Sequence, residues 1–206
     1  MSNFRLPLIY PILDRACFAD SAVLFAAAQA LVAVGCTLIQ YRNKIGSARE
    51  MLSDARELRR IVGRDVTLIM NDRADLAVVA EFDGVHVGQD DLPVESVRKV
   101  VGSKMIVGAS THNPEQLRLA DRTSADYLAI GPVFETSSKA NPDPVVGLDG
   151  VKATRALTRK PLVAIGGITV ANAKSVIESG ADSLALISAL VPEVAKSYEG
   201  FRAVLL

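Results

Sequence analysis

The chain has 206 residues, of which 50% are apolar and 22% charged, and its 23 basic residues balance 23 acidic ones. This length suits one domain, residues 1–206, with a sizeable core, and it lies near the lower end of the size range of α/β barrels. Zero net charge without any lysine or arginine run argues against a nucleic-acid partner, and the longest apolar stretch, residues 22–34, is too short to cross a bilayer.

Short β-rich runs alternate with helix-patterned segments along the chain, without a linker that would divide it. We predict strands at residues 8–12, 38–41, 67–71, 84–87, 105–110, 127–130, 162–165 and 183–187. We predict helices at residues 21–34, 48–62, 73–79, 94–101, 114–120, 148–157, 171–179 and 192–204. Nearly continuous apolar strands are typical of a parallel sheet covered on both faces. Eight such repeats predict an α/β fold of the (β/α)8 TIM barrel type, whereas a doubly wound open sheet would normally have a glycine-rich turn after its first strand.

Active sites of such barrels lie at the carboxyl ends of the strands, and there the second predicted strand runs into Gln40-Tyr41-Arg42-Asn43-Lys44. Alternation along an extended chain places Gln40, Arg42 and Lys44 on one side. An amide and two cations there predict a site for an anion with several phosphate oxygens, and Lys139, beyond the sixth strand, adds a third candidate cation. A solvated loop with surface cations is the alternative.

Two aspartates follow neighbouring predicted strands. Asp72 comes after Asn71 at the end of the third strand, and Asp91 comes shortly after the fourth. Hard oxygen ligands without cysteine or paired histidines indicate Mg²⁺, which takes one or two carboxylates and completes its shell with water and substrate phosphates. The alternative for Asp72 is capping of the helix that follows it.

The ends of the last two predicted strands indicate a phosphate site. Gly166 and Gly167 form a turn that would let backbone N–H groups approach a phosphate, and Ile187-Ser188 ends the eighth strand. The alternative is that the glycines serve only the tight turn.

The two histidines are the only side chains that ordinarily titrate near neutral pH. His86 lies in an apolar strand and is expected to be a hydrogen-bonded interior residue, whereas for His112, beyond a strand end, both a functional and a structural role remain open. No Ser/His/Asp arrangement and no cysteine with a base can be assembled.

The remaining features of the sequence indicate no further catalytic or binding residue. Cys17 and Cys36 form no C-x-x-C pair and have no neighbouring histidine, so we expect both to be small buried side chains without a metal or redox role. The first residues lack the layout of a secretory signal, so we expect a cytoplasmic protein. The sequence leaves the oligomeric state open, and a homo-oligomer is compatible with it.

Taken together in chain order, the residues at the ends of the predicted strands resemble those of the thiamine phosphate synthase family. Members of this family join the pyrimidine and thiazole halves of thiamine. The resemblance runs from Gln40 to Ser188. Its most specific segments are Gln40-Tyr41-Arg42-Asn43-Lys44, Asn71-Asp72, Gly84-Val85-His86-Val87-Gly88-Gln89-Asp90-Asp91 and the stretch from Ala125 to Lys139.

The resemblance implies a role for each matching residue. Ligands of the pyrimidine diphosphate would be Gln40, Tyr41, Arg42, Asn43, Lys44, Asn71, Ser110 and Lys139. Ligands of the thiazole phosphate would be Thr136, Ser137, Ser138, Gly167, Ile187 and Ser188. Asp72 and Asp91 would hold Mg²⁺ as cofactor, in agreement with their spacing. Pyrophosphate would leave to give a pyrimidine cation, so Arg42, Lys44, Ser110 and Lys139 would be catalytic by absorbing the charge of the leaving group, and no nucleophile would be needed.

Two departures and two rival functions accompany this interpretation. Ser138 replaces a threonine that is usual in the family but keeps the hydroxyl, whereas the charge of Glu135 beside a phosphate site has no explanation in the sequence. One rival is a thiazole tautomerase on the same barrel, which lacks the magnesium carboxylates. The other is a non-catalytic protein that binds phosphorylated ligands, which should have lost some of these charged residues. The accepted thiazole could be the plain or the carboxylated form.

Overall fold

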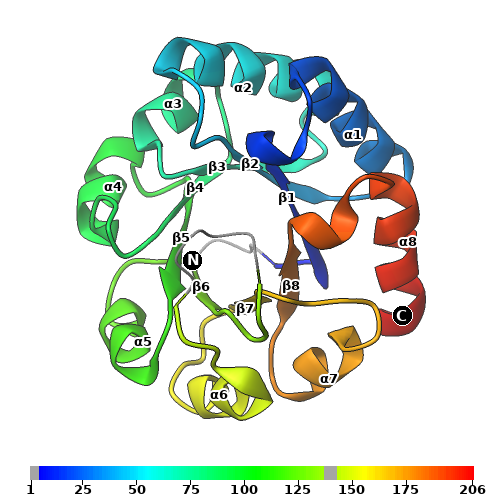
Figure 1. Ribbon diagram of the computed structural model, residues 1–206. Coiled ribbons are helices and arrows are strands. Elements are labelled where there is room, and N and C mark those ends of the chain that lie inside the picture. The colour runs from blue at the N-terminus through cyan, green and yellow to red at the C-terminus, as the bar shows by residue number, and fades with distance from the viewer. Residues whose placement is uncertain (1–4, 137–142) are drawn as a thin grey trace.

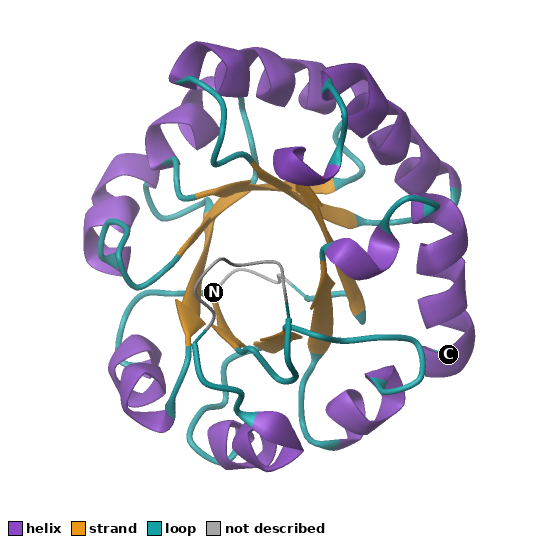
Figure 2. Cartoon of the chain, in the orientation of Figure 1, coloured by secondary structure: helices purple, strands orange, loops and turns teal. Residues whose placement is uncertain are grey.

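The computed structural model describes residues 5–136 and 143–206, and in them eight parallel strands form a closed barrel surrounded by eight α-helices (Figures 1 and 2). Each strand pairs with the next in chain order, and β8 closes on β1. The strands are β1 (Ile9–Asp14), β2 (Leu38–Arg42), β3 (Thr67–Asn71), β4 (Gly84–Val87), β5 (Ile106–Thr111), β6 (Tyr127–Ile130), β7 (Leu162–Ile165) and β8 (Ser183–Leu186). The α-helices are α1 (Ser21–Ala33), α2 (Ala48–Val62), α3 (Ala74–Val79), α4 (Val94–Val101), α5 (Pro114–Asp121), α6 (Gly147–Arg155), α7 (Ala173–Glu178) and α8 (Val194–Leu205). Two short 3-10 helices, η1 (Arg15–Cys17) and η2 (Ser188–Leu190), follow β1 and β8.

The predicted (β/α)8 TIM barrel is confirmed, and every bound of a strand or helix lies within two residues of its expected position. The difference that matters is at β1, which was expected to end at residue 12 but continues to Asp14. It continues because Leu13 and Asp14 pair in register with Tyr41 and Arg42 of β2. The extension brings a carboxylate to the carboxyl end of the barrel, next to an arginine.

The interior of the barrel holds two tyrosines, Tyr10 and Tyr127, both at most 1% exposed. They pack with small and branched side chains from the other strands. Gly108 on β5 lies opposite Tyr127 in register, and a Cβ atom at Gly108 would come within 2.1 Å of the Tyr127 ring. The glycine therefore makes room for the tyrosine ring inside the barrel.

Three ion pairs of the same kind stabilise the amino-terminal end of the barrel. An aspartate directly before an even-numbered strand accepts the backbone N–H of a residue in the preceding strand and pairs with an arginine from the last part of a helix. The three units, given as arginine, aspartate and N–H donor, are Arg59, Asp83 and Leu68; Arg98, Asp126 and Val107; and Arg155, Asp182 and Leu162. Each arginine also donates to backbone carbonyls around its aspartate. These contacts tie helix, loop and strand together at the end opposite the catalytic face of such barrels.

Ser183, at the start of β8, is fully buried, and its hydroxyl makes no hydrogen bond. A buried hydroxyl without a partner costs free energy, so we expect Ser183→Ala to raise the free energy of unfolding by about 1 kcal/mol. Denaturant titration of the purified variant measures this. The matched control is Thr111→Val, because the buried Thr111 hydroxyl donates to the carbonyl of Ala129 at 2.8 Å. That variant should lose about 1 kcal/mol, and a loss at both positions would contradict the prediction for Ser183.

The cysteines differ from each other. Cys36 is buried, as expected, and its thiol donates to the carbonyl of Leu38. The expectation for Cys17 is wrong, because Cys17 ends η1, which lies on the surface.

In the described part of the chain, no helix has the length and apolar character that a membrane span requires.

Candidate active site

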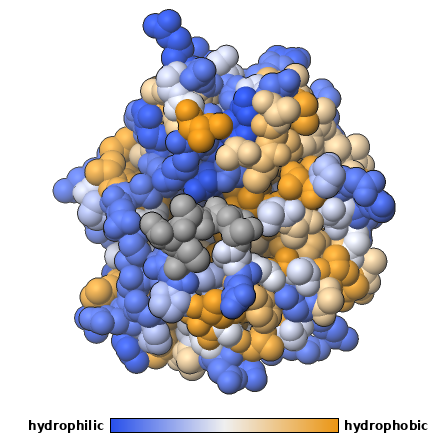
Figure 3. All heavy atoms as spheres, in the orientation of Figure 1, coloured by the Kyte–Doolittle hydropathy of each residue, from blue (hydrophilic) through white to orange (hydrophobic). Residues whose placement is uncertain are grey.

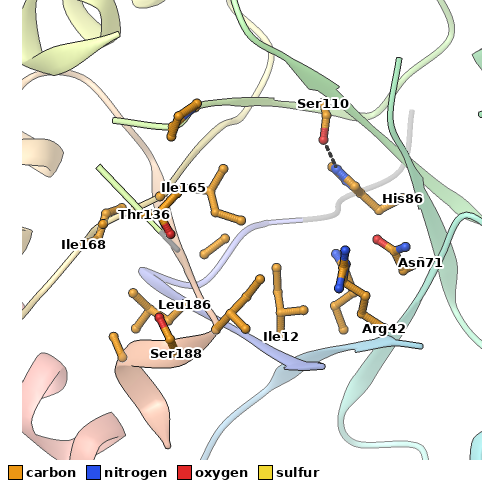
Figure 4. A pocket seen from close by; sticks show the side chains of 18 of the residues that line it. Ile12, Arg42, Asn71, His86, Ser110, Thr136, Ile165, Ile168, Leu186 and Ser188 are labelled. Atoms are coloured by element: carbon orange, nitrogen blue, oxygen red, sulfur yellow. Dashed lines mark hydrogen bonds between the residues drawn. The ribbon is translucent and has the colours of Figure 1, made fainter. Parts of the chain in front are cut away.

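A pocket opens at the carboxyl ends of the strands, where the residues that line it have two different characters (Figure 4). Its polar lining includes Gln40, Arg42, Asn71, His86 and Ser110, which come from four consecutive strands, β2 to β5. Its apolar lining includes Ile12, Ile165, Ile168, Ala185, Leu186 and Ile187. Figure 3 shows the same division, with hydrophilic residues concentrated over the β2–β4 side of this face and more apolar ones over the β8 side. The pocket can therefore hold a charged group on one side and flat apolar rings on the other.

The end of β2 brings only part of the expected anion site into this pocket. Gln40 and Arg42 line it, while Lys44 is absent from its lining and has a half-exposed side chain. Arg42 forms an ion pair with Asp14, and Lys44 forms one with Asp72. The two cations thus lie at different depths, one in the pocket and one at its rim, and each already has a carboxylate partner.

Tyr41 and Asn43 point away from the pocket, to the outer side of β2. The buried Tyr41 hydroxyl donates to Asp54 of α2 at 2.8 Å and accepts from Asn43 Nδ2 at 3.0 Å. The Asn43 side chain in turn accepts the backbone N–H groups of Ile45 and Gly46. The structure does not bring these two residues to the pocket as ligands. Instead, they hold the loop that follows β2 and carries Lys44.

Tyr41→Phe should therefore act mainly on stability. It leaves the buried Asp54 carboxylate and the Asn43 amide each without one partner, so we expect a loss of about 1–2 kcal/mol in the free energy of unfolding. The Michaelis constants for the substrates of the pocket should change less than threefold, because Tyr41 does not line the pocket. Denaturant titration and steady-state kinetics on one preparation measure both. Unchanged stability with a Michaelis constant raised tenfold or more would instead indicate a substrate ligand.

The two aspartates lie together beside the pocket. The Asp72 and Asp91 carboxyl groups lie within hydrogen-bonding reach of each other, Asp72 also pairs with Lys44, and Asp91 accepts the backbone N–H of Gly88 at 2.8 Å. Burial and the neighbouring Asp91 raise the pKa of Asp72 to about 6. Burial also acts to raise the pKa of Asp91, but the hydrogen bonds from Asp72 and Gly88 outweigh it and lower that pKa. Because a pKa of about 6 for Asp72 lies below neutral pH and that of Asp91 is lowered, both carboxylates are ionised at pH 7, and one lysine neutralises only half of their charge.

This arrangement fits a divalent cation better than it fits capping. Asp72 makes no capping hydrogen bond to α3, whose N-cap is Arg73. Asp72 adopts φ = 62°, a left-handed conformation that directs its side chain toward Asp91 at the expense of backbone strain. Among the described residues, no group of three or more acidic, histidine or cysteine side chains could hold a metal. A cation here would therefore take two carboxylates and complete its shell with water and substrate oxygens, as Mg²⁺ does.

Only some of the expected thiazole phosphate ligands, and not the expected diphosphate ligand Lys139, lie within the described residues. Thr136, Gly167, Ile187 and Ser188 all line the pocket, beside the short helix η2. Ser137, Ser138 and Lys139 lie outside the described residues. Glu135 is exposed and absent from the pocket lining, and nothing in the structure explains its charge.

The glycines after β7 are needed for close packing as well as for their turn. Gly166 and Gly167 have φ values of 100° and 64°. A Cβ atom at Gly166 would come within 2.5 Å of Pro132, and one at Gly167 within 2.5 Å of the Glu135 carbonyl oxygen. The loop after β7 is thus pressed against the loop after β6, and any side chain would separate them.

Both histidines line the pocket. His86 is an interior residue, as expected: Nδ1 lies 2.9 Å from the Tyr127 hydroxyl and Nε2 lies 2.8 Å from Ser110 Oγ. Burial lowers the pKa of His86 to about 4, so its ring is neutral at pH 7. Nδ1 of His112 lies 2.6 Å from the carbonyl oxygen of Gly131 and 3.4 Å from an Asp143 carboxylate oxygen.

Sequence reasoning missed Asp14 and the apolar side of the pocket. Asp14 follows an apolar run, which is the same signal that marked Asp72, but the first strand was expected to end two residues earlier. Ile12 and Leu186 gave no signal, because an apolar strand residue that faces the pocket has the same sequence pattern as one that faces the core.

Comparisons with known proteins agree on one family. A family model described as thiamine monophosphate synthase matches residues 9–190. A thiamine-phosphate synthase of Koribacter versatilis is 61% identical over 193 residues, which cover 92% of each chain. One of Chloroflexus aurantiacus is 46% identical, over 81% of this chain and 77% of the relative. Among solved structures, a thiamine phosphate pyrophosphorylase from Pyrococcus furiosus superposes with a TM-score of 0.83 at 33% identity, covering 96% of this chain and 94% of the other.

Proposed function

Because this chain belongs to the thiamine monophosphate synthase family, we propose that it is a thiamine phosphate synthase that joins a pyrimidine methyl diphosphate to a thiazole phosphate. The pyrimidine substrate is 4-amino-2-methyl-5-(diphosphooxymethyl)pyrimidine, and the second is 4-methyl-5-(2-phosphoethyl)thiazole or its carboxylated form. The observation that carries this proposal is the two-sided pocket beside the Asp72–Asp91 pair. It offers cations and hydrogen-bond donors for a leaving diphosphate next to an apolar surface for two aromatic rings. Both substrates carry phosphate groups that keep them inside a cell, which supports a cytoplasmic enzyme.

The polar side of the pocket would hold the diphosphate. Arg42 supplies a planar fork of N–H donors, and Asn71 and Ser110 supply neutral donors. Lys44 at the rim would add positive charge, and Lys139, which lies outside the described residues, is proposed to add a further cation. Donors that are already positioned stabilise charge as it develops on the leaving group, so Arg42, Lys44, Ser110 and Lys139 are proposed to be catalytic.

Asp72 and Asp91 would hold Mg²⁺. When bound, the cation would neutralise charge on the departing pyrophosphate. In its absence, the Asp72 ion pair would keep Lys44 at the rim of the pocket. Because the pKa of Asp72 is raised to about 6, a divalent cation that binds near or below that pH would displace the proton from Asp72.

Loops after β6, β7 and β8 would bind the thiazole phosphate. Thr136, Gly167, Ile187 and Ser188 lie together at this side of the pocket, and Ser137 and Ser138 would add hydroxyl groups. Loops after the last two strands of such barrels, together with a short extra helix, are a recurrent phosphate site, and η2 is such a helix here. The thiazole ring would then lie on the apolar side, facing the pyrimidine.

The reaction proposed is departure of pyrophosphate to leave a pyrimidine cation, followed by attack of the thiazole nitrogen on its methylene carbon. No protein nucleophile is required, and the described pocket offers hydrogen-bond donors and an apolar surface. The test mixes the purified protein with both substrates and Mg²⁺, with and without chelator, and measures thiamine phosphate after oxidation to its fluorescent derivative. Chelator-sensitive product is expected. Folded protein that binds thiazole phosphate but forms no product would favour a tautomerase or a binding protein.

A further inference from the structure

A continuous chain of hydrogen bonds crosses the barrel interior and ends at the pocket. It begins at the buried amide of Gln40 and ends at the hydroxyl of Ser110. Its links are Gln40 Nε2 to Tyr10 Oη at 2.8 Å, Tyr10 Oη to Tyr127 Oη at 2.8 Å, Tyr127 Oη to His86 Nδ1 at 2.9 Å, and His86 Nε2 to Ser110 Oγ at 2.8 Å. Figure 4 shows the last of these links at the edge of the pocket. The two tyrosine hydroxyls have no part in the proposed substrate contacts.

The direction of this chain follows from its first member. An amide nitrogen only donates, so the Tyr10 hydroxyl accepts from Gln40 and gives its single hydrogen to Tyr127. Continued in the same direction, the chain has Tyr127 give its hydrogen to His86 Nδ1, which is then unprotonated. A neutral imidazole with a bare Nδ1 carries its hydrogen on Nε2, and Nε2 donates to Ser110 Oγ. With that contact filled, the Ser110 hydrogen cannot point at His86.

We propose that Tyr10, Tyr127 and His86 form a proton-ordered chain that turns the Ser110 hydrogen into the pocket, where it donates to an anionic phosphate oxygen of the substrate. The identity of that oxygen as part of a diphosphate rests on the proposed function. His86 and the tyrosines are positioning residues, because they act through Ser110. A diphosphate can only accept hydrogen bonds, so a serine locked as a donor suits it, whereas a serine that points its hydrogen at histidine presents a repelling lone pair.

The chain is rigid enough to hold this order. The His86 ring stacks on the Tyr127 ring with centroids 5.5 Å apart, and the Tyr10 ring meets Tyr127 edge to face at 6.0 Å. Gly108 leaves space for the Tyr127 ring, because a Cβ atom there would overlap it. The packed rings thus fix the positions of the two phenol oxygens between Gln40 and His86.

The first test reads the tautomer of His86 directly. Long-range ¹H–¹⁵N correlation spectra of the ligand-free protein distinguish a protonated Nε2 from a protonated Nδ1, with His86→Gln used for assignment. We expect Nε2–H in the wild type and a mixture of both tautomers in Tyr127→Phe, which removes the donor to Nδ1. A wild-type Nδ1–H tautomer would reverse both links of His86 and overturn the proposal. This measurement does not depend on any enzymatic activity.

The second test measures coupling between Tyr127 and Ser110 with inorganic pyrophosphate and Mg²⁺ as the probe. Ser110→Ala should weaken pyrophosphate binding about 10- to 100-fold, as expected for the loss of a hydrogen bond to a charged group. Tyr127→Phe alone should weaken it about tenfold or less, since its effect is limited to the loss of Ser110 orientation. In the Ser110→Ala background, Tyr127→Phe should have no further effect.

Tyr198→Phe on α8 is the matched control, because it removes a tyrosine hydroxyl that bonds to Cys36 far from the pocket. It should leave pyrophosphate binding unchanged. If the effects of Tyr127→Phe and Ser110→Ala simply multiply, the tyrosine acts through general packing and the proposal fails. Failure of the proposed function would show differently, as absent synthesis of thiamine phosphate by a protein whose tautomer and pyrophosphate binding follow the expectation.

Discussion

Replacing Asp72 with asparagine is expected to lower kcat about 10²- to 10³-fold, because it removes one of the two carboxylates that would hold Mg²⁺. Asparagine is the informative substitution here. Asp72 has φ = 62°, which asparagine tolerates and alanine does not, so loss of activity can be separated from backbone strain. The measurement is the rate of thiamine phosphate formation as a function of Mg²⁺ concentration.

The control for Asp72→Asn is Asp75→Asn, which removes a nearby carboxylate that pairs with Arg73 on the surface of α3. It should retain wild-type activity. In the wild type, the Mg²⁺ concentration needed for half-maximal rate should rise as pH falls below about 6, because protonation of Asp72 competes with the cation. A pH-independent Mg²⁺ requirement, or near-normal turnover of Asp72→Asn, would remove Asp72 from the metal site.

Arg42→Gln is expected to reduce kcat/KM about 10²- to 10³-fold and to lower the free energy of unfolding by about 2–3 kcal/mol. The first effect comes from the loss of a cation beside the leaving diphosphate. The second comes from Asp14, which is 3% exposed and would lose its ion-pair partner while remaining buried. Kinetics and denaturant titration on the same preparation give both numbers.

A double variant separates these two roles of Arg42. Asp14→Asn together with Arg42→Gln removes the buried charge as well as its partner, so most of the lost stability should return. Activity should not return, since no cation has been restored. Recovery of activity together with stability would mean that Arg42 serves the barrel and not the substrate.

Strand order, helix positions and the location of the pocket were predictable because each depends on local pattern. Continuous apolar runs separated by amphipathic segments specify parallel strands and covering helices, and the carboxyl ends of such strands meet at one face. Polar residues after those runs, such as Asn71 and Ser110, were for the same reason identifiable as pocket residues. Whether each of them binds substrate stays a prediction.

Side-chain partners were not predictable, because they depend on which strands are neighbours and how their registers match. Tyr41 and Asn43 lie in the same segment as Arg42, yet the alternation of the strand turns them toward α2 and away from the pocket. Asp14 pairs with Arg42 only because β1 and β2 align at those two residues. Nothing within either segment specifies that alignment.

The sequence by itself determined the barrel and the face on which its pocket opens, since these follow from the order and periodicity of residues along one chain. Its motifs at the strand ends indicated the family by resemblance. Only the tertiary structure decided that the carboxyl groups of Asp72 and Asp91 lie together, that Lys44 lies at the rim, and that a chain of hydrogen bonds joins Gln40 to Ser110. Each of these contacts joins residues from different strands or from the loops that follow them. Their distances are set by closure of the barrel and by the packing of two tyrosines inside it, which no local pattern encodes.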